Sequence, residues 1–297
     1  MPDVPDLRAS LGAVAIQRDV VRVSGPDAVE YLQGQLSQDV LSLEDGGSAR
    51  SLLLQPTGKV DAWLRVTRVG PEELMLDVDS GFGDQVHARL QRFKLRTKVD
   101  LTCERWSGLA VRGSGASDVD APSGAMALPA GWPGIEGVDL LSDGELAVAG
   151  IPLVDSDALH ALRVECGVPA MGSELTDATI PAEAGQWLID SSVSFTKGCY
   201  TGQELVARVD SRGGNVPRPL RGLKVAASSE VSAAALVGAD VESAGRSIGT
   251  VTSAATSPRL GLIALALVGR AAAVGDVVEL RWADGSGEAT IAGLPFL

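Results

Sequence analysis

The sequence changes character at residues 212–219, an Arg-, Gly- and Pro-rich stretch that forms the clearest linker of the chain. After this linker come only short candidate strands bounded by turn residues, over 220–226, 246–253, 261–268, 276–283 and 288–293. This run predicts a small C-terminal β-barrel or β-sandwich. Before the linker, helical and strand patterns are mixed, which is typical of an α+β arrangement. A chain of 297 residues also exceeds the size at which one core usually keeps growing, so we expect two or three domains.

The charge balance argues against bulk binding to nucleic acid or to anionic membranes. The chain carries 25 basic and 38 acidic residues, for a formal net charge of -13, and such a chain repels polyanions overall. Its most apolar run, residues 262–268, is too short to span a bilayer. We therefore expect no direct nucleic-acid partner and no membrane partner.

The cysteine and histidine content favours a reducing compartment. Cys103, Cys166 and Cys199 lie far apart and form no CxxC pair, and the histidines are His87 and His160. No His lies near a Cys at the spacing of a zinc module, so we assign no metal ligands, and we interpret His160 as a surface or satisfied core histidine. Sparse, odd-numbered thiols are typical of a reducing cytoplasm, which is the expected location.

The stretch 197–204 reads Lys-Gly-Cys-Tyr-Thr-Gly-Gln-Glu and follows a short apolar run. The pattern predicts a strand, a tight turn and a helix. Gly198 and Gly202 permit backbone conformations or close approaches that a side chain would block. Thr201 is followed three residues later by Glu204, a capping-box pattern that makes Thr201 the predicted N-cap.

Cys199 would then lie just ahead of a helix N-terminus, where unpaired N–H groups and the helix dipole favour an anion. Lys197 adds a cation two residues away. Both features favour the thiolate, the form of cysteine that attacks electrophiles and binds metals. The alternative interpretation is a buried, unreactive cysteine beside a capped helix.

Residues 92–99 alternate basic and mostly apolar side chains, which predicts a strand with four cations on one face. That face is either a solvated surface that blocks edge pairing or a wall that attracts an anionic ligand.

Several loops carry chemically useful groups that together suggest a polar pocket for a heterocycle with donor groups. A carboxylate can accept two hydrogen bonds from an amidine-like N–H pair, and an apolar surround strengthens that pair. Taken singly, carboxylates on such loops are more often solvent-facing. The set is Asp39, Lys59, Arg163, Glu165, Glu183, Lys197, Cys199 and Arg208.

The sequence at 197–204 resembles the signature of the YgfZ family of folate-binding iron–sulfur proteins. This family is related to the glycine-cleavage T-protein, an aminomethyltransferase that uses tetrahydrofolate, and to a mitochondrial iron–sulfur assembly factor. Further blocks that resemble the family extend the likeness over nearly the whole chain. They are residues 23–40, 52–68, 163–174, 180–185 and 248–268.

The resemblance implies a T-protein-like α+β fold of three domains. Two intertwined α+β domains and a C-terminal β-barrel would surround a central folate cavity. Residues 1–50 and 150–212 would form discontinuous domain 1, which carries the motif. Residues 51–149 would form domain 2, and residues 219–297 the barrel, domain 3.

The resemblance also implies roles for individual residues. Glu183 falls where the T-protein family places the acid that binds the pterin ring, whose ring N–H and amino group offer a donor pair. Cys199 is the expected working thiol. Lys197 and Arg208 are candidates, on charge alone, for binding the glutamate tail. The other candidate folate-binding residues are Asp39, Arg163, Glu165, Tyr200 and Gln203.

One departure from the T-protein pattern bears on activity. T-proteins carry a Gly-Gly-x-x-Asp-Asp run in the second block, whereas this chain has Ala62-Trp63 in place of the Asp pair and Asp61 one position early. A one-residue slip on a strand points a side chain to the opposite face. Neither Ala nor Trp can exchange a proton or stabilise a developing iminium ion by charge. We therefore expect folate binding to be kept and glycine-cleavage chemistry to be lost.

The favoured hypothesis is a protein that binds tetrahydrofolate, or a one-carbon derivative of it. It would assist assembly, insertion or repair of iron–sulfur clusters in client enzymes, including tRNA-modifying ones. The expected partners are folate and iron–sulfur client or assembly proteins. Because clusters usually need four ligands, Cys199 would hold a cluster only transiently. Two alternatives stay open: a folate-dependent aminomethyltransferase or other one-carbon transferase, and an interaction scaffold in which folate has no role.

Overall fold

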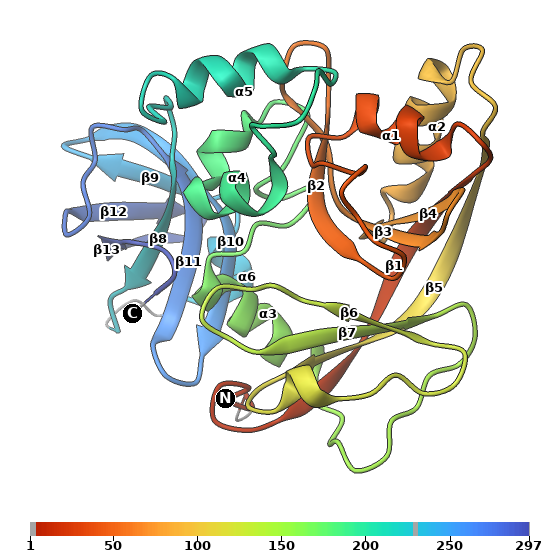
Figure 1. The fold of residues 1–297 in the computed structure, drawn as a ribbon. Coiled ribbons are helices and arrows are strands. Elements are labelled where there is room, and N and C mark those ends of the chain that lie inside the picture. The colour runs from red at the N-terminus through yellow and green to blue at the C-terminus, as the bar shows by residue number, and fades with distance from the viewer. Residues whose placement is uncertain (1–3, 228–230, 297) are drawn as a thin grey trace.

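The computed structural model describes residues 4–227 and 231–296. In the first two-thirds of these residues, seven antiparallel strands form a sheet in the order β2-β3-β4-β1-β5-β7-β6 (Figure 1). The first strand pairs with both β4 and β5 and so lies in the middle of the sheet. The strands are β1 (Gly12–Ser24), β2 (Ser48–Leu54), β3 (Val60–Gly70), β4 (Glu73–Asp79), β5 (Asp100–Arg112), β6 (Met126–Pro129) and β7 (Gly137–Ser142).

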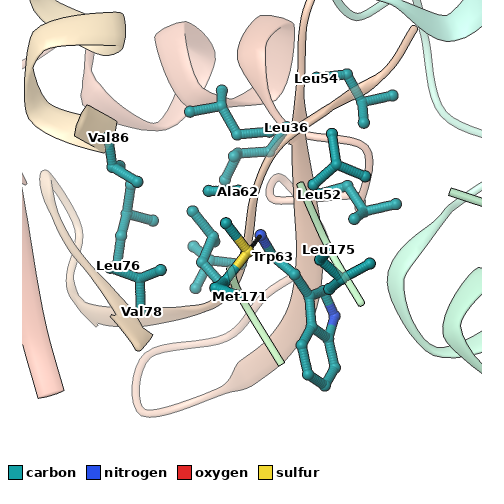
Figure 2. Close-up of a cluster of buried hydrophobic side chains, with 14 of the residues drawn as sticks. Leu36, Leu52, Leu54, Ala62, Trp63, Leu76, Val78, Val86, Met171 and Leu175 are labelled. Carbon is teal, nitrogen blue, oxygen red and sulfur yellow. Dashed lines mark hydrogen bonds between the residues drawn. The ribbon is translucent and has the colours of Figure 1, made fainter. Parts of the chain in front are cut away.

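Two helices, α1 (Ala28–Gln35) and α2 (Gly83–Phe93), cover one face of this sheet (Figure 1). Alternate residues of β3 and β4 are buried against them, and Figure 2 shows Val86 of α2 above Leu76 and Val78. Burying one such side chain contributes about 1.5–3 kcal/mol. The apolar alternation in these strands therefore fixes which face receives the helices.

The chain then forms helices that join the sheet to the second structural unit. Helix α3 (Ser156–Cys166) lies between the sheet and the barrel, contacting β1 on one side and β10 on the other (Figure 1). Its N-cap is Asp155, whose carboxylate accepts the N–H of Asp157. The segments that follow are η2 (Pro181–Ala184), α4 (Gln186–Ser192) and α5 (Gln203–Asp210), and a short η1 (Ala116–Asp118) lies between β5 and β6.

The C-terminal strands close into a barrel in the order β10-β11-β8-β13-β12-β9. Its interior is filled by apolar residues that include Leu223, Val241 and Leu280. The elements are β8 (Leu220–Val225), α6 (Ala233–Leu236), β9 (Asp240–Ser243), β10 (Arg246–Ser257), β11 (Gly261–Val268), β12 (Val277–Trp282) and β13 (Gly285–Ala292).

The predicted α+β class and C-terminal barrel are confirmed. The predicted strand over 92–99 is wrong, because Arg92 and Phe93 end α2 and β5 begins only at Asp100. The guanidinium of Arg89 lies 3.7 Å from the centre of the Phe93 ring, and Leu95 has a positive φ of 46°, so this stretch turns instead of extending.

The strand predicted just before the 197–204 motif is also wrong. Helix α4 ends at Ser192, and Val193 and Ser194 continue as a loop in which the Ser194 N–H donates to the Ser37 carbonyl. The proposed division of residues 1–149 at residue 50 runs through the sheet, since β1 pairs within it, and the domain boundaries stay a prediction. In the described ranges, no helix has both the length and the apolarity needed to cross a bilayer.

Candidate functional site

A cavity of about 360 Å³ lies between the sheet and α3. Its walls come from strands β1 to β5 and β7, the β6–β7 connection, α3 and the loop after α3. This volume falls within the roughly 300–1,000 Å³ that is typical of small-molecule sites. The charged and aromatic residues of the wall are Arg18, Arg50, Trp63, Asp79, Arg112, Trp132, Asp139, His160 and Arg163.

Buried ion pairs hold the sheet side of this cavity. Asp77, which is fully buried, accepts from Nε of Arg65 at 2.8 Å and from Nε of Arg18 at 3.0 Å. Asp139 accepts from Arg65 at 3.1 Å and from Arg112 at 2.8 Å. Burial alone would raise the pKa of both carboxyl groups, but the neighbouring arginines lower it below the usual range. The wall therefore carries fixed charges at neutral pH.

Two tryptophans give the cavity aromatic walls. Trp63 is buried, and its indole N–H donates to the Ser192 hydroxyl at 2.9 Å. The Arg50 guanidinium lies 4.9 Å from the centre of the Trp63 ring, and the Arg112 guanidinium lies 4.4 Å from that of Trp132. Aromatic faces beside fixed guanidinium groups suit a flat heterocyclic ligand.

Arg163 is the one predicted site residue that lines this cavity. Its guanidinium donates to Glu174 at 3.1 Å and to the Ser253 hydroxyl at 2.7 Å, and Ser253 in turn donates to Glu174 at 2.6 Å. These contacts connect α3 to β10 of the barrel. His160 also lines the cavity, and its Nε2 lies 3.0 Å from the Ala254 carbonyl oxygen.

Glu165 connects α3 to residues near both ends of the chain, Arg8 and Phe296. Its carboxylate is buried and accepts from Arg8 at 2.9 Å and from the Ser257 hydroxyl at 2.5 Å. Its carbonyl oxygen accepts the Phe296 N–H at 2.9 Å. All of these contacts are within the protein, so Glu165 has a structural role in holding these segments against α3.

Glu183 lies on η2, outside the cavity wall. It is 1% exposed, accepts the Ile180 N–H at 3.1 Å and lies 3.6 Å from Nε of Arg218. The groove beside η2 has a volume of about 20 Å³, which is room for about one water molecule. Glu183 as a pterin ligand stays a prediction.

Cys199 is exposed, whereas Cys166 is buried and Cys103 is partly buried. It borders an open surface hollow formed by Gly34, Pro56 and residues 199–204. The predicted alternative of a buried Cys199 is therefore wrong, and the reactivity of this thiol stays a prediction. Burial raises the pKa of Cys166 to about 11, so that thiol is the buried, unreactive one.

Lys197 fixes the loop that presents Cys199. Its ammonium donates to the carbonyl oxygens of Gln33 and Leu36 at 2.7 Å and to that of Gln38 at 2.8 Å. Burial lowers the pKa of Lys197 to about 8, against the opposing charge of Asp39. With all three N–H donors used inside the protein, a folate-tail role for Lys197 gains no support.

The remaining candidate residues on or near the motif differ in their exposure. Tyr200 is buried, and burial raises its pKa to about 12. Asp39 accepts from the Gln33 amide at 2.9 Å, Gln203 borders the surface hollow, and Arg208 is exposed on α5. The structure thus brings Asp39, Lys197, Cys199, Tyr200 and Gln203 into one surface region and leaves Arg163, Glu165 and Glu183 in three other places.

The predicted capping box at Thr201 is wrong. Helix α5 begins at Gln203 and its N-cap is Gly202, which has a left-handed φ of 83°. A Cβ at Gly202 would come within 2.4 Å of the Gln55 carbonyl oxygen, so the β2–β3 turn approaches too closely for any side chain. The role predicted for Gly198 is also wrong, because its φ is not positive and a Cβ there would meet nothing within 4 Å.

Asp61 does not replace the acids of the T-protein pattern. The register of β2 and β3 pairs Leu54 with Val60 and Leu53 with Ala62, which leaves Asp61 as the extra residue of a bulge. Its carboxylate pairs with Nε of Arg89 on α2 at 3.1 Å. Trp63, in contrast, lines the cavity. The expected loss of glycine-cleavage chemistry stays a prediction.

Several cavity residues were missed from the sequence, notably Arg50, Asp79, Arg112, Trp132 and Asp139. Single charged residues inside apolar strand patterns, such as Asp77 in β4, were the available signal. A charge in a buried strand is expensive unless it is paired. Nothing in the local pattern shows which strands bring these charges together.

The seven-stranded sheet, the closed C-terminal barrel and the cavity between the sheet and α3 define a protein of the T-protein fold class. The structure superposes on the glycine cleavage system aminomethyltransferase T from Bartonella henselae with a TM-score of 0.80 at 21% identity, covering 98% of this chain and 87% of that one. Residues 218–297 match the family model of the glycine cleavage T-protein C-terminal barrel domain. The predicted T-protein-like fold is thus confirmed.

Sequence relatives show which proteins of this fold class the chain resembles. The chain is 30% identical to the tRNA-modifying protein YgfZ of Edwardsiella ictaluri, over 66% of this chain and 65% of that protein. It is 28% identical to the mitochondrial iron-sulfur cluster assembly factor IBA57 homolog of Neurospora crassa, over 70% of this chain and 52% of that protein. The chain thus spans half to two-thirds of the length of these two relatives. Together, these similarities support a protein of the YgfZ family that is related to the T-protein.

Proposed function

We propose that this protein binds a reduced folate in the cavity between the sheet and α3. We further propose that it assists assembly, insertion or repair of iron–sulfur clusters in client enzymes, tRNA-modifying enzymes among them, in the cytoplasm. Cys199 is its working thiol. The observation that carries the proposal is the exposure of Cys199 on the loop with the family signature, while the other two thiols are buried or partly buried.

The folate part of the proposal is supported by the chemistry of the cavity. Trp63 and Trp132 offer aromatic faces, and Leu159 and Val168 add apolar surface. Asp79 lines the same wall with a side chain that is 35% exposed; one of its oxygens accepts from Arg18 and the other accepts the Met171 N–H at 3.1 Å, which leaves further acceptor capacity on each oxygen. The cavity thus offers stacking surface and a carboxylate acceptor for a ring with N–H donors.

The iron–sulfur part is supported by the similarity to an iron-sulfur cluster assembly factor and to YgfZ proteins, and by the exposed position of Cys199. One thiolate supplies one of the four ligands that a cluster usually needs. A cluster at Cys199 would therefore be cargo shared with the client or with another assembly protein. Within residues 4–227 and 231–296, no three His, Cys, Asp or Glu side chains gather as a metal-ligand group.

Aminomethyl transfer is not the activity we propose. Ala62 is buried among the apolar side chains beneath the helices, and the indole N–H of Trp63 is bonded to Ser192. Neither side chain can take up a proton or stabilise an iminium ion. Asp61 is paired with Arg89, away from the cavity wall.

Titration calorimetry with tetrahydrofolate tests the cavity assignment. The wild-type protein should show saturable binding, and Trp132→Leu should weaken it roughly tenfold, because an aromatic contact contributes about 0.5–1.5 kcal/mol beyond its area. Trp282→Leu, a half-buried tryptophan of the barrel, is the matched control and should bind like wild type. Absence of binding to the wild-type protein would overturn the folate proposal.

A further inference from the structure

The sheet side of the cavity carries more positive than negative side chains. Four arginines lie there, Arg18, Arg50, Arg65 and Arg112, with three carboxylates, Asp77, Asp79 and Asp139. Arg18 pairs with Asp77 and Asp79, Arg65 with Asp77 and Asp139, and Arg112 with Asp139. On the α3 side, Arg163 is balanced by Glu174. One guanidinium is left in excess.

The excess charge is that of Arg50. In the described part of the chain, no carboxylate lies within 4.0 Å of it. One N–H donates to the Ala130 carbonyl oxygen at 3.2 Å, and the guanidinium faces the Trp63 ring. An arginine has five N–H donors in a planar fork. The remaining donors of this half-buried side chain are therefore open to the cavity that it lines.

Arg112, beside the cavity, adds an N–H donor that has no hydrogen-bond acceptor among the described residues. It is 2% exposed, and its Nε is buried without a hydrogen-bond partner among the described residues. Its guanidinium faces Trp132, in the loop whose Ala130 carbonyl accepts from Arg50. Burial lowers the pKa of Arg50 to about 10, and the charge of Arg65 adds to this effect. Arg50 nevertheless remains charged at neutral pH.

A half-buried positive charge with no carboxylate within 4.0 Å is costly, and the buried Nε of the neighbouring Arg112 also lacks a partner among the described residues. A bound anion would remove the first cost. Carboxylates match the guanidinium fork with two parallel hydrogen bonds. We propose that the cavity selects ligands that carry a carboxylate, and that Arg50 binds this acid group beside Trp63. This inference rests on the proposed function, since it assigns the carboxylate to the glutamyl part of a reduced folate.

The test compares tetrahydrofolate with its diamide, in which both glutamyl carboxylates are replaced by uncharged amides of similar size. Calorimetry on the wild-type protein should give roughly ten- to hundredfold tighter binding of tetrahydrofolate than of the diamide, as expected for a charge-assisted pair. In Arg50→Gln, tetrahydrofolate should bind as weakly as the diamide, whose affinity should be unchanged. Arg50→Lys should keep part of the difference in affinity between the two ligands. Arg246→Gln, which changes an exposed arginine on the barrel, is the matched control and should show the full wild-type difference.

Equal affinities of the two ligands for the wild-type protein would overturn this inference without any variant, and folate binding itself would stand. The same conclusion follows if Arg50→Gln weakens both ligands equally or weakens neither. If the wild-type protein binds neither ligand, the folate proposal fails and this inference fails with it.

Discussion

Asp77→Asn is expected to lower the free energy of unfolding by about 3–5 kcal/mol, the usual cost of breaking a buried ion pair by removing one partner. The carboxylate is fully buried and accepts from both Arg65 and Arg18. The amide keeps the shape of the side chain, so the loss reflects charge and hydrogen bonding and not a cavity. Urea unfolding, read as a shift in midpoint at constant slope, gives the value.

Asp284→Asn, at an exposed position of the barrel, is the matched control and should change stability by less than about 0.5 kcal/mol. The pH dependence gives an independent check. Because the folded-state pKa of Asp77 is lowered, its stabilising contribution is fully present above the unfolded value of about 3.9 and is lost as the pH falls through the folded value. The variant should lose this part of the acid sensitivity. An Asp77→Asn protein as stable as wild type would show that the buried charges are not what holds the sheet side of the cavity.

Lys197→Met is expected to lower the free energy of unfolding by about 2–4 kcal/mol, because three carbonyl oxygens lose a charged donor. Each unsatisfied acceptor costs about 1–3 kcal/mol, and relief of the burial cost that lowers the pKa of Lys197 offsets part of that sum. The three bonds are 2.7–2.8 Å long and tie the Cys199 loop to the end of α1. Amide hydrogen exchange should rise in residues 34–40 and 197–202, where these contacts lie.

Lys59→Met tests whether this effect is specific to the bonded ammonium. Lys59 is also partly buried, on the β2–β3 turn that approaches Gly202, and in the described residues it forms no ion pair with a carboxylate. A loss of stability in Lys59→Met as large as in Lys197→Met would contradict the role assigned to the Lys197 contacts.

The local patterns predicted the classes of structure better than the contacts of single residues. Alternating apolar residues in β3 and β4 give the sheet its two faces, and turn residues after the linker mark the barrel strands. The capping box at Thr201 failed because its context is tertiary. Gly202 is needed where the Gln55 carbonyl approaches, and that approach joins segments about 150 residues apart, which no local rule can detect.

The cavity could not be predicted for the same reason. Arg50, Trp63, Arg112 and Trp132 meet only because β1 inserts between β4 and β5 and so determines the order of the sheet. The chemistry of Glu183 and Lys197 makes both of them candidates from the sequence, but both side chains form their hydrogen bonds inside the protein. The motif makes Cys199 a candidate, whereas its exposure is a property of the folded loop.

The most direct test of the central claim is the activity of iron–sulfur enzymes under oxidative stress in a deletion strain that expresses Cys199→Ser. Serine keeps the size and polarity of the exposed side chain, so thermal unfolding, protein level and tetrahydrofolate affinity should match those of wild type. We predict that the enzyme activities nevertheless fall to the level of the deletion strain, while Cys103→Ser restores them. Full restoration by Cys199→Ser at the same protein level would contradict the account.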